Sequence, residues 1–497
     1  MKKDVIKDYF NRSGYFSEYL PSEFSIHGIK DTFSKNKVGK VKPYNYSMSK
    51  FQIEDHRRSI HVPELISYLA AIEKISESNV LDKILQTDEN SQHSFSKLMI
   101  KNEVVRHSNP SDRTLSLQMG RNVDEEKFSY SFNLTKKIIN SSGAKGILYL
   151  DIANFFGSFY THNITAIFRG EQWALEQYNL KKNNEMVDDE YTRLERIDSA
   201  IRNMNIGRSH GLLVGPFISK VLAETLMNTI DKEIEKEDIK FVRFMDDYEI
   251  FVYEESEIDL ITAKVENILS EYGFSLNSAK TNYIRFPYSD KNDLTSIFDS
   301  SKKELQIINL FNRFIEIEIT KKQKGAIKYL ISRIDEFDKE SNDLVISLIV
   351  NAIINNPNST VVAINKLINK LNEKKIETQT NRVVESLLVF LRICVKNKYD
   401  LEQVWIVYAI LKINSNCKFD FNDLNELAAM VVLCESNNLN EEYIKKHAGK
   451  CFLLDYELWR RDIITDDDIF GFHELDQEIY CKLKKSDFSF YKKKTTD

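Results

Sequence analysis

The order of hydrophobic and polar positions divides this chain into two parts of different character. Up to about residue 300, short apolar runs such as 147–150 and 241–252 alternate with helical patterns. Beyond that point, hydrophobic residues recur at helical spacing in successive segments, for example 325–337, and Asn-, Asp- and Lys-rich breaks separate them. The pattern predicts an α/β domain over residues 1–300. It also predicts an all-α domain over residues 301–497, built as a helical stack or as a compact irregular bundle.

The apolar run 241–252 is interrupted by two adjacent carboxylates, Asp246 and Asp247. A short connection that contains Asp, between two β-rich runs, predicts a tight hairpin with both acids at its tip. Two like charges this close repel each other, so keeping both ionised favours a bound cation. The hairpin is therefore half of a candidate divalent-metal site. A solvated turn is the alternative, because Asp is a common turn former.

A third carboxylate follows another apolar run. Residues 147–150 read as a buried strand, and Asp151 stands at its C-terminal end, before a turn and a helix. Open α/β sheets place their chemistry at that end of a strand. A cap for the following helix is the alternative interpretation of Asp151.

Three further segments carry candidate chemistry. Gly215 and Pro216 mark the start of a long amphipathic helix, and Lys280 follows a short extended segment near residue 275. Arg57 and Arg58 precede another amphipathic helix, and paired arginines in that position are suited to hold a triphosphate.

Composition limits the function classes. At 497 residues the chain is long enough for two or three domains, and a net charge of −6 means that any nucleic-acid surface must be locally basic. We expect no membrane segment, because no run of about 18 apolar residues occurs. The five cysteines form no C-x-x-C pair, which indicates neither a zinc site nor a disulfide framework and favours a reducing, cytoplasmic location.

Four segments together resemble the palm of reverse transcriptases. "LDIANFFGSFYTH", "GLLVGPFISKVLAE", "RFMDDYEIF" and "YGFSLNSAKT" are similar to motifs A, B, C and D of that superfamily and occur in the same order. The resemblance implies that Asp151 and Asp246 bridge two Mg²⁺ or Mn²⁺ ions. Asp247 would be a secondary ligand, and the carbonyl of Ile152 would supply another.

The same resemblance implies roles for other residues. Phe156, five residues after the motif A aspartate, would lie under the sugar and exclude a 2′-hydroxyl, which favours DNA synthesis. Lys280 would protonate or neutralise the leaving pyrophosphate. Gly215, with Arg57 and Arg58, would complete the nucleotide site.

Motif B departs from the pattern of template-copying reverse transcriptases. Leu213, Val214 and Gly215 stand where Pro-Gln-Gly is usual. Val214 cannot make the polar contacts expected of that glutamine beside the nascent base pair. The substitution argues against faithful copying of a template.

Further segments, "GYFSEYLP", "RRSIHVP", "SFYTH" and "KGAIKYL", resemble the abortive-infection reverse transcriptases, the AbiK-like Abi polymerases. The resemblance implies reverse-transcriptase-like fingers and palm, followed by HEAT-like α-helical repeats in place of the usual thumb. It also implies antiphage defence, homo-oligomers, and untemplated DNA synthesis from dNTPs. In that family a tyrosine hydroxyl is the primer, and the single-stranded DNA product stays covalently attached to it.

The priming tyrosine is expected near the N-terminus. Tyr9 is the first choice, because it lies near the free end among polar neighbours, and Tyr15, Tyr19 and Tyr44 are alternatives, with Tyr46 also open. Two other functions stay open as well. One is a template-dependent reverse transcriptase that uses a nucleic-acid primer, and the other is a non-catalytic defence scaffold whose helical domain binds a phage or host protein.

Overall fold

The computed structural model describes most of the chain. The described residues are 2–27, 29, 41–49, 57–76, 79–96, 98–101, 104–107, 136–286, 294, 297–299, 307–320, 323–337, 342–373, 377–419 and 423–493. The chain divides into two compact units. The first unit comprises residues 1–17, 29–43 and 61–289, and the second comprises 18–28, 44–60 and 290–497. A single boundary near residue 300 therefore does not describe segments 18–28 and 44–60, which group with the C-terminal half.

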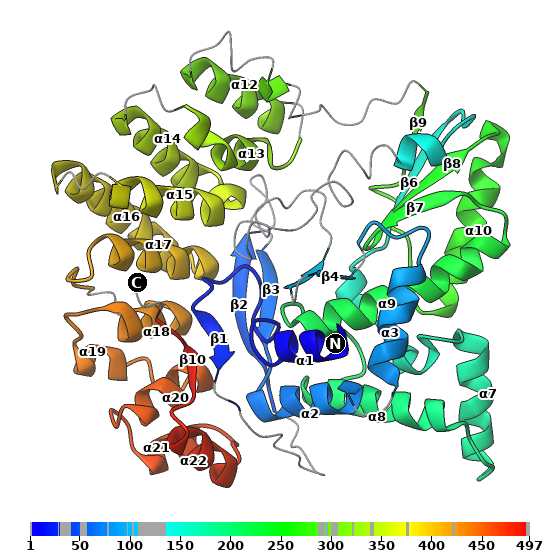
Figure 1. Ribbon diagram of the computed structural model, residues 1–497, viewed down its shortest axis with the longest axis horizontal. Helices are drawn as coiled ribbons and strands as arrows, with labels where there is room; N and C mark the ends of the chain where they lie inside the picture. Colours follow the sequence, from blue (N-terminus) through cyan, green and yellow to red (C-terminus); the bar gives the residue numbers. More distant parts are fainter. Residues whose placement is uncertain are drawn as a thin grey trace. The chain divides into compact units, whose positions relative to one another are not determined.

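A four-stranded antiparallel sheet of the first unit carries Asp151 and Asp247 (Figure 1). Its order is β7 (Phe241–Phe244), β8 (Asp247–Val252), β6 (Gly146–Asp151) and β9 (Asn282–Arg285). The two apolar runs predicted as strands are thus neighbours in the sheet, and Asp151 pairs directly with Asp247.

The register gives the sheet two faces of different composition. Because side chains alternate along a strand, residues that pair directly share a face. One face, here the packed face, carries Arg243, Tyr248, Ile250, Leu148 and Leu150, all of which are buried. The other, here the acidic face, carries Asp151, Asp247, Tyr149 and Glu249, and continues into a small apolar cluster of Ile147, Val242 and Phe251.

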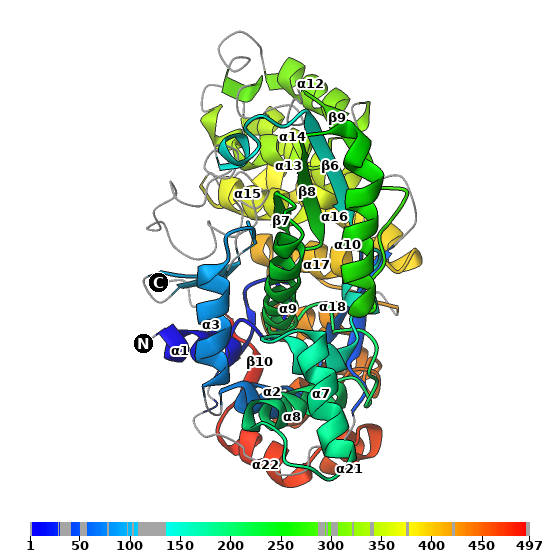
Figure 2. The ribbon, with the colours of Figure 1, turned by 90° about the vertical axis from the view of Figure 1, so that its right-hand side faces the viewer.

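Two long helices of the first unit run beside the sheet, α9 (Phe217–Lys236) and α10 (Ile258–Glu271) (Figure 2). The polar side chains of the packed face bond to α9. Proline precedes the first helical residue of α9, one position before the expected first turn, and adopts an extended conformation there.

The remaining elements of the first unit surround this core. They are α1 (Lys2–Phe10), α2 (Leu65–Ser76), α3 (Val80–Asn90), β4 (Leu98–Lys101), β5 (Val104–His107), a short helix over 136–140, α6 (Phe155–Ser158), the 3₁₀ helix η2 (Thr161–Ala166), α7 (Glu171–Lys182), α8 (Asp189–Asn203) and η3 (Glu255–Glu257). In this unit β4 pairs with β5. Strand β2 (Tyr44–Ser49) belongs to the second unit and pairs with β3 (Arg57–Val62), most of which also belongs to the second unit.

The second unit is a succession of helices. They are α12 (Ile307–Ile319), α13 (Ala326–Ser332), η4 (Ile334–Glu336), α14 (Asn342–Asn355), η5 (Pro357–Ser359), α15 (Thr360–Glu373), α16 (Glu377–Lys396), α17 (Asp400–Ile413), α18 (Glu426–Glu435), α19 (Glu441–Lys445), α20 (Phe452–Arg460), α21 (Asp466–Phe472) and α22 (Gln477–Lys485). Neighbouring helices pack together in the pairs α13–α14, α14–α15 and α16–α17, and next-but-one helices do so in the pairs α13–α15, α14–α16 and α15–α17. Strand β1 (Phe24–His27) pairs with β10 (Ser489–Tyr491), which joins segments from opposite ends of the chain.

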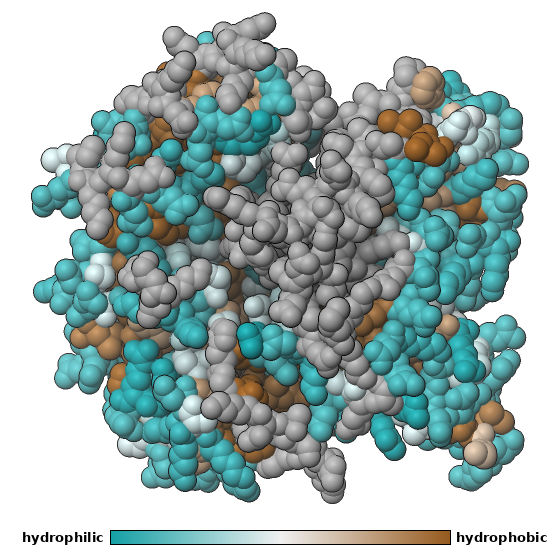
Figure 3. Space-filling model, viewed as in Figure 1, coloured by the Kyte–Doolittle hydropathy of each residue, from teal (hydrophilic) through white to brown (hydrophobic). Residues whose placement is uncertain are grey.

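Hydrophilic residues cover most of the described surface on the side shown in Figure 3. Within the described ranges, no single helix has both the length and the apolar character needed to cross a membrane. One bent pair, Asn342–Asn355 with Pro357–Asn372, passes on length and composition alone.

Candidate active site

The Asp-Asp hairpin closes over a two-residue turn, Met245 and Asp246, because Phe244 pairs directly with Asp247. Only one acid therefore lies in the turn, and Asp247 is the first residue of β8 rather than a second tip residue as expected. Met245 has φ of 54°, in the left-handed region that residues with a Cβ atom avoid. Such a conformation costs roughly 1–3 kcal/mol and persists only where surrounding contacts hold it.

Asp247 stands directly opposite Asp151, the last residue of β6. The amide of Ile152 donates to the carbonyl of Asp246 at 3.1 Å, so the next pair is the hydrogen-bonded one. Asp151 and Asp247 consequently form a non-hydrogen-bonded pair, in which Cα atoms lie about 4.5 Å apart and the side chains are closest. The two carboxylates predicted from separate segments are thus neighbours on the acidic face.

Asp151 is buried and receives hydrogen bonds from the segment that resembles motif D. Lys280 Nζ lies 2.6 Å from Asp151 Oδ1, and Asn277 Nδ2 donates to Oδ2 at 3.1 Å. The amide of Asn277 also donates to the carbonyl of Asp151 at 2.8 Å. The predicted lysine therefore lies in the site, in direct contact with the motif A aspartate.

The charges on the acidic face are not balanced. Desolvation of its carboxylate, then the charges of Asp246 and Asp151, raises the pKa of Asp247 to about 7, although the residue still reaches solvent. Lys280 lowers that pKa and is the smallest of these influences. A carboxylate whose ionised form is disfavoured by its neighbours is one that a cation would stabilise.

The residues present fit a divalent ion by chemistry, because carboxylate and carbonyl oxygens are the hard donors that Mg²⁺ and Mn²⁺ prefer. The repulsion that raises the pKa of Asp247 is the observation that favours a cation here. Among the described residues, however, no group of three or more His, Cys, Asp or Glu side chains is arranged to hold an ion.

Phe156 is half-buried in α6, with its ring 5.3 Å from that of the buried Phe155. Its carbonyl accepts the amide of Leu212 at 2.8 Å, which ties α6 to the segment before Gly215. Gly215 has φ of 136°, a conformation that requires glycine. The carbonyl of Val214 accepts the amide of His61 at 2.7 Å, so β3 reaches the segment that resembles motif B.

The two arginines that were predicted to hold a triphosphate, Arg57 and Arg58, lie at the start of β3. Arg57 forms an ion pair with Glu402 of the second unit, donates to Ser47 Oγ at 2.9 Å, and lies 4.5 Å from the ring centre of Tyr399. Its guanidinium is therefore occupied within the second unit, and Arg58 is exposed. Both arginines belong to the second unit, whereas Asp151 belongs to the first.

Two of the candidate priming tyrosines are held by their hydroxyls. The buried Tyr15 donates to the carbonyl of Pro63 at 2.5 Å. Tyr44 donates to Glu426 at 2.9 Å, and burial, followed by the charges of Cys451 and Glu426, raises its pKa well above the ordinary value. Deprotonation of the Tyr44 hydroxyl is correspondingly unfavourable.

The other two candidates are half-buried. Tyr9, in the first unit, packs its ring edge-on against Phe217, the first residue of α9, at 4.9 Å between ring centres. Tyr19 belongs to the second unit, and its carbonyl accepts the indole N–H of Trp405 at 2.7 Å. The open alternative Tyr46 is buried.

One residue of the site was not singled out from the sequence. Asn277 lies three residues before Lys280, and the turn between them directs both side chains at Asp151. The signal was the spacing, since residues three apart in a turn can reach the same group. It was overlooked because Asn in such a segment is a common turn residue.

A comparison with protein families matches residues 66–334, more than half of the chain, to the family described as reverse transcriptase (RNA-dependent DNA polymerase). Similar solved structures include apo telomerase from Candida tropicalis, at 12% identity and a TM-score of 0.31, covering 83% of this chain and 69% of that one. Telomerase from Candida albicans in complex with the TWJ fragment of telomeric RNA gives 11% identity and a TM-score of 0.27, with 82% and 64% covered. At these values the likeness does not extend to function. A comparison with curated proteins found no match.

Proposed function

This chain belongs to the reverse transcriptase (RNA-dependent DNA polymerase) family, and from that premise we propose that it is a template-independent, protein-primed DNA polymerase of antiphage abortive infection. The observation that carries the polymerase chemistry is the pairing of Asp151 with Asp247, with Lys280 on Asp151. Val214, in place of a template-contacting glutamine, supports untemplated synthesis.

Two Mg²⁺ or Mn²⁺ ions would be held by Asp151 and Asp246, with Asp247 and the carbonyl of Ile152 as further ligands. When bound, such ions activate the attacking hydroxyl and hold the triphosphate. These residues come from β6 and from the turn between β7 and β8, so the sheet register sets their spacing.

Lys280 supplies the positive charge that pyrophosphate requires as it leaves. Its Nζ already carries a proton that it donates to Asp151 Oδ1, and the same proton can move to the leaving oxygen. Its side chain is 56% exposed, so Lys280 can reach either partner. Phe156, one residue into α6 and half-buried, is proposed as the ring that excludes a ribose 2′-hydroxyl.

Tyr9 remains the proposed primer, with dNTPs as substrates and single-stranded DNA as the attached product. The hydroxyl of Tyr15 makes a buried hydrogen bond and that of Tyr44 a partly buried one, which argues against both as primers. Tyr9 also lies against Phe217, two residues after Gly215, and so is close in the fold to the segment that resembles motif B.

The decisive experiment offers purified protein dNTPs alone, with no template or primer. We expect a DNA ladder that phenol removes until protease is added, and mass spectrometry should map the first nucleotide to Tyr9. Tyr9→Phe should lose this product, while Tyr178→Phe, an exposed tyrosine on α7 of the same unit, should retain it. Strict dependence on an added template would overturn the proposal in favour of a template-dependent reverse transcriptase with a nucleic-acid primer.

The second unit is proposed to be a HEAT-like repeat domain, since its helices pack on next and next-but-one neighbours. We further propose a cytoplasmic homo-oligomer, on the resemblance to abortive-infection polymerases. A non-catalytic scaffold that binds a phage or host protein through the helices makes the opposite prediction in cells. If Asp246→Ala retained full antiphage protection, catalysis would not be the function.

A further inference from the structure

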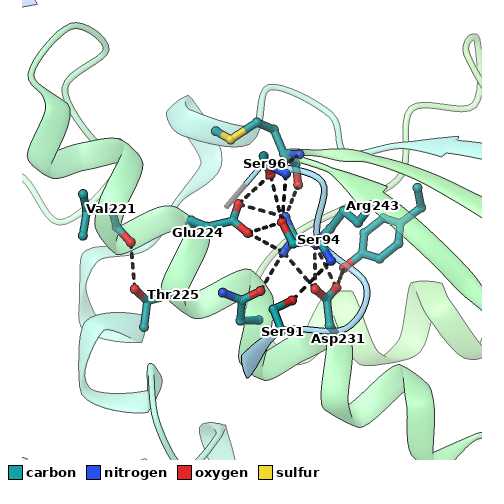
Figure 4. A network of polar contacts seen from close by, with 11 residues as sticks. Ser91, Ser94, Ser96, Val221, Glu224, Thr225, Asp231 and Arg243 are labelled. Carbon is teal, nitrogen blue, oxygen red and sulfur yellow. Dashed lines mark hydrogen bonds and ion pairs between the residues drawn. The ribbon is translucent and has the colours of Figure 1, made fainter. Parts of the chain in front are cut away.

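A buried ionic network lies directly beneath the Asp-Asp turn, on the packed face of the sheet (Figure 4). Its centre is Arg243, which is fully buried in β7 between two carboxylates of α9, Glu224 and Asp231. Tyr248 donates to Asp231 Oδ1 at 3.0 Å. The proposed chemistry gives roles to Asp246 and Asp247 but none to Arg243.

The guanidinium has acceptors for all of its N–H groups. Nε donates to Asp231 at 2.9 Å, and Nη2 donates to Asp231 at 2.8 Å and to Glu224 at 2.9 Å. Nη1 donates to Glu224 Oε2 at 3.1 Å, which leaves one N–H, and this donates to the carbonyl of Met245 at 2.8 Å. Arginine alone offers five donors in a fixed fork, so no other side chain could make these contacts together.

The amide of Met245 is held from the other side. It donates to Ser96 Oγ at 3.0 Å, and the same hydroxyl donates to Glu224 Oε2 at 2.9 Å. Glu224 Oε2 is thus the common acceptor for both groups that hold Met245. Both peptide groups of this turn residue are fixed by side chains of the network rather than by the strand ladder.

This clamp explains how the strained turn persists. Met245 has φ of 54°, and contacts that over-determine such a conformation are what keep it populated. Asp246 follows Met245 directly, so the peptide held by Arg243 sets where the Asp246 side chain begins.

We propose that Arg243, Ser96 and Glu224 are positioning residues that fix the Met245 peptide and thereby set the metal affinity of the site at Asp246. The inference rests on the proposed function, because it concerns the divalent ions of that function. Residues that orient metal ligands without touching the ion change affinity by about 10- to 100-fold when removed.

Two buried serines of one segment make a matched test. Ser96→Ala removes the acceptor of the Met245 amide. Ser94→Ala removes a hydrogen bond of 2.5 Å to Glu224 from a hydroxyl that reaches the turn only through Ser96, whose amide and hydroxyl it also contacts. Both variants lose one buried hydroxyl to the same carboxylate, so both should lower the midpoint of urea unfolding by similar amounts.

The measurement is Mn²⁺ binding to the full chain without nucleotide, followed by electron paramagnetic resonance of the free ion. Ser96→Ala should raise the Kd for Mn²⁺ about 10-fold, at the lower end of that range. Ser94→Ala should raise the Kd less than Ser96→Ala does, because its hydroxyl acts on the turn only through Ser96. In steady state, the apparent KM for Mg²⁺ should rise in Ser96→Ala, while the KM for dNTP at saturating Mg²⁺ stays constant. Arg243→Lys should weaken Mn²⁺ binding more than Ser96→Ala does. If Arg243→Lys does not fold, the comparison of the two serine variants still tests the positioning role.

The positioning role is overturned if Ser96→Ala binds Mn²⁺ as the wild type does, or if both serine variants weaken binding equally. A wild-type chain that binds no Mn²⁺ would instead overturn the proposed metal site itself. The two failures are therefore distinguishable in one titration series.

Discussion

The two faces of the four-stranded sheet hold similar charges in opposite ways. On the packed face, Arg243 is fully buried and satisfied by Glu224 and Asp231, and hydroxyls complete their hydrogen bonding. On the acidic face, Asp151 and Asp247 lie directly opposite each other. The exposed Lys280 pairs with Asp151, and Lys137 pairs with Glu249.

The difference distinguishes acids that are paired with a buried cation from an acid whose main neighbours are other acids. A buried charge is tolerated when it is paired and hydrogen-bonded, and Glu224 and Asp231 meet that condition. On the acidic face, desolvation of the Asp247 carboxylate, followed by the charge of Asp246 and a hydrogen bond with Asp151, raises the pKa of Asp247 to about 7. Unfavourable charge that the fold itself does not compensate is typical of binding and catalytic sites.

The largest effect expected on the acidic face is loss of chemistry. Asp246→Ala should lower dNTP incorporation by about 1,000-fold or more, because it removes a proposed ligand of the metal ions that act together in nucleotidyl transfer. Incorporation of labelled dNTP measures this, and the urea midpoint should not fall. Asp259→Ala, an exposed acid on α10, is the control and should stay active. Equal loss in both variants would show that general charge, and not this site, was responsible.

The packed face should respond in stability instead. Arg243→Met should reduce the free energy of unfolding by about 3–5 kcal/mol, because it leaves two buried carboxylates without their cation. Urea denaturation followed by circular dichroism measures the change. Arg285 lies in β9 of the same sheet and forms an exposed ion pair with Glu255 of η3. Arg285→Met breaks this pair and should leave stability unchanged. If the two variants behaved alike, the contrast between the faces would fail.

The rim of the acidic face should set sugar selectivity. Phe156→Ala should reduce discrimination against ribonucleotides by about 10- to 100-fold, because removing a packed ring opens space for one hydroxyl. The measurement is the ratio of kcat/KM for a dNTP and the matching NTP. Phe156→Tyr, which keeps the ring, should retain the discrimination. A ratio unchanged in Phe156→Ala would remove this residue as the gate.

The smallest effect is the pH dependence of stability that Asp247 contributes on the acidic face. The folded pKa of Asp247, about 7, exceeds the unfolded value of about 3.9, so the folded state binds more protons in between. The free energy of unfolding of the wild type should therefore fall, relative to that of Asp247→Asn, as pH rises from about 4 to 7. Above that range, the difference between the two proteins, here called the gap, should level off. Thermal unfolding in EDTA at each pH measures the gap. A gap that stays constant with pH would contradict the charge imbalance.

The acidic face could be anticipated from the sequence, and the packed face could not. Asp151 and the Asp-Asp turn are signalled by short local patterns, a strand end and a hairpin. Arg243 occupies an alternating polar position in β7, which reads as solvent-facing until the register places it with Tyr248. Its partners come from α9 and from segment 91–96, distant in sequence, and only the spacing of Glu224, Asn228 and Asp231 along one helix face hinted at them.

The nucleotide arginines show a related limit of local patterns. Arg57 reads as a phosphate ligand because two arginines precede a helix, yet its guanidinium is used by Glu402, which lies 345 residues further along the chain. Tyr44 is similar, since its position in a lysine-rich loop gave no sign of its bond to Glu426. In both cases the partner belongs to the second unit, as segment 44–60 itself does.

The pairing of β1 with β10 has a consequence for how this chain is made. The second unit begins with segments 18–28 and 44–60 but is completed only by residues near 490. A ribosome therefore releases β1 long before β10 exists, whereas β2 can pair with β3 as soon as residues 57–62 are made, and the first unit can fold in the interval. Until β10 is made, β1 presents an unpaired edge, which is a template for aggregation. The order of residues along the chain thus sets the order of folding. The sheet that carries the aspartates can form first, and the second unit is completed last, when β10 pairs with β1.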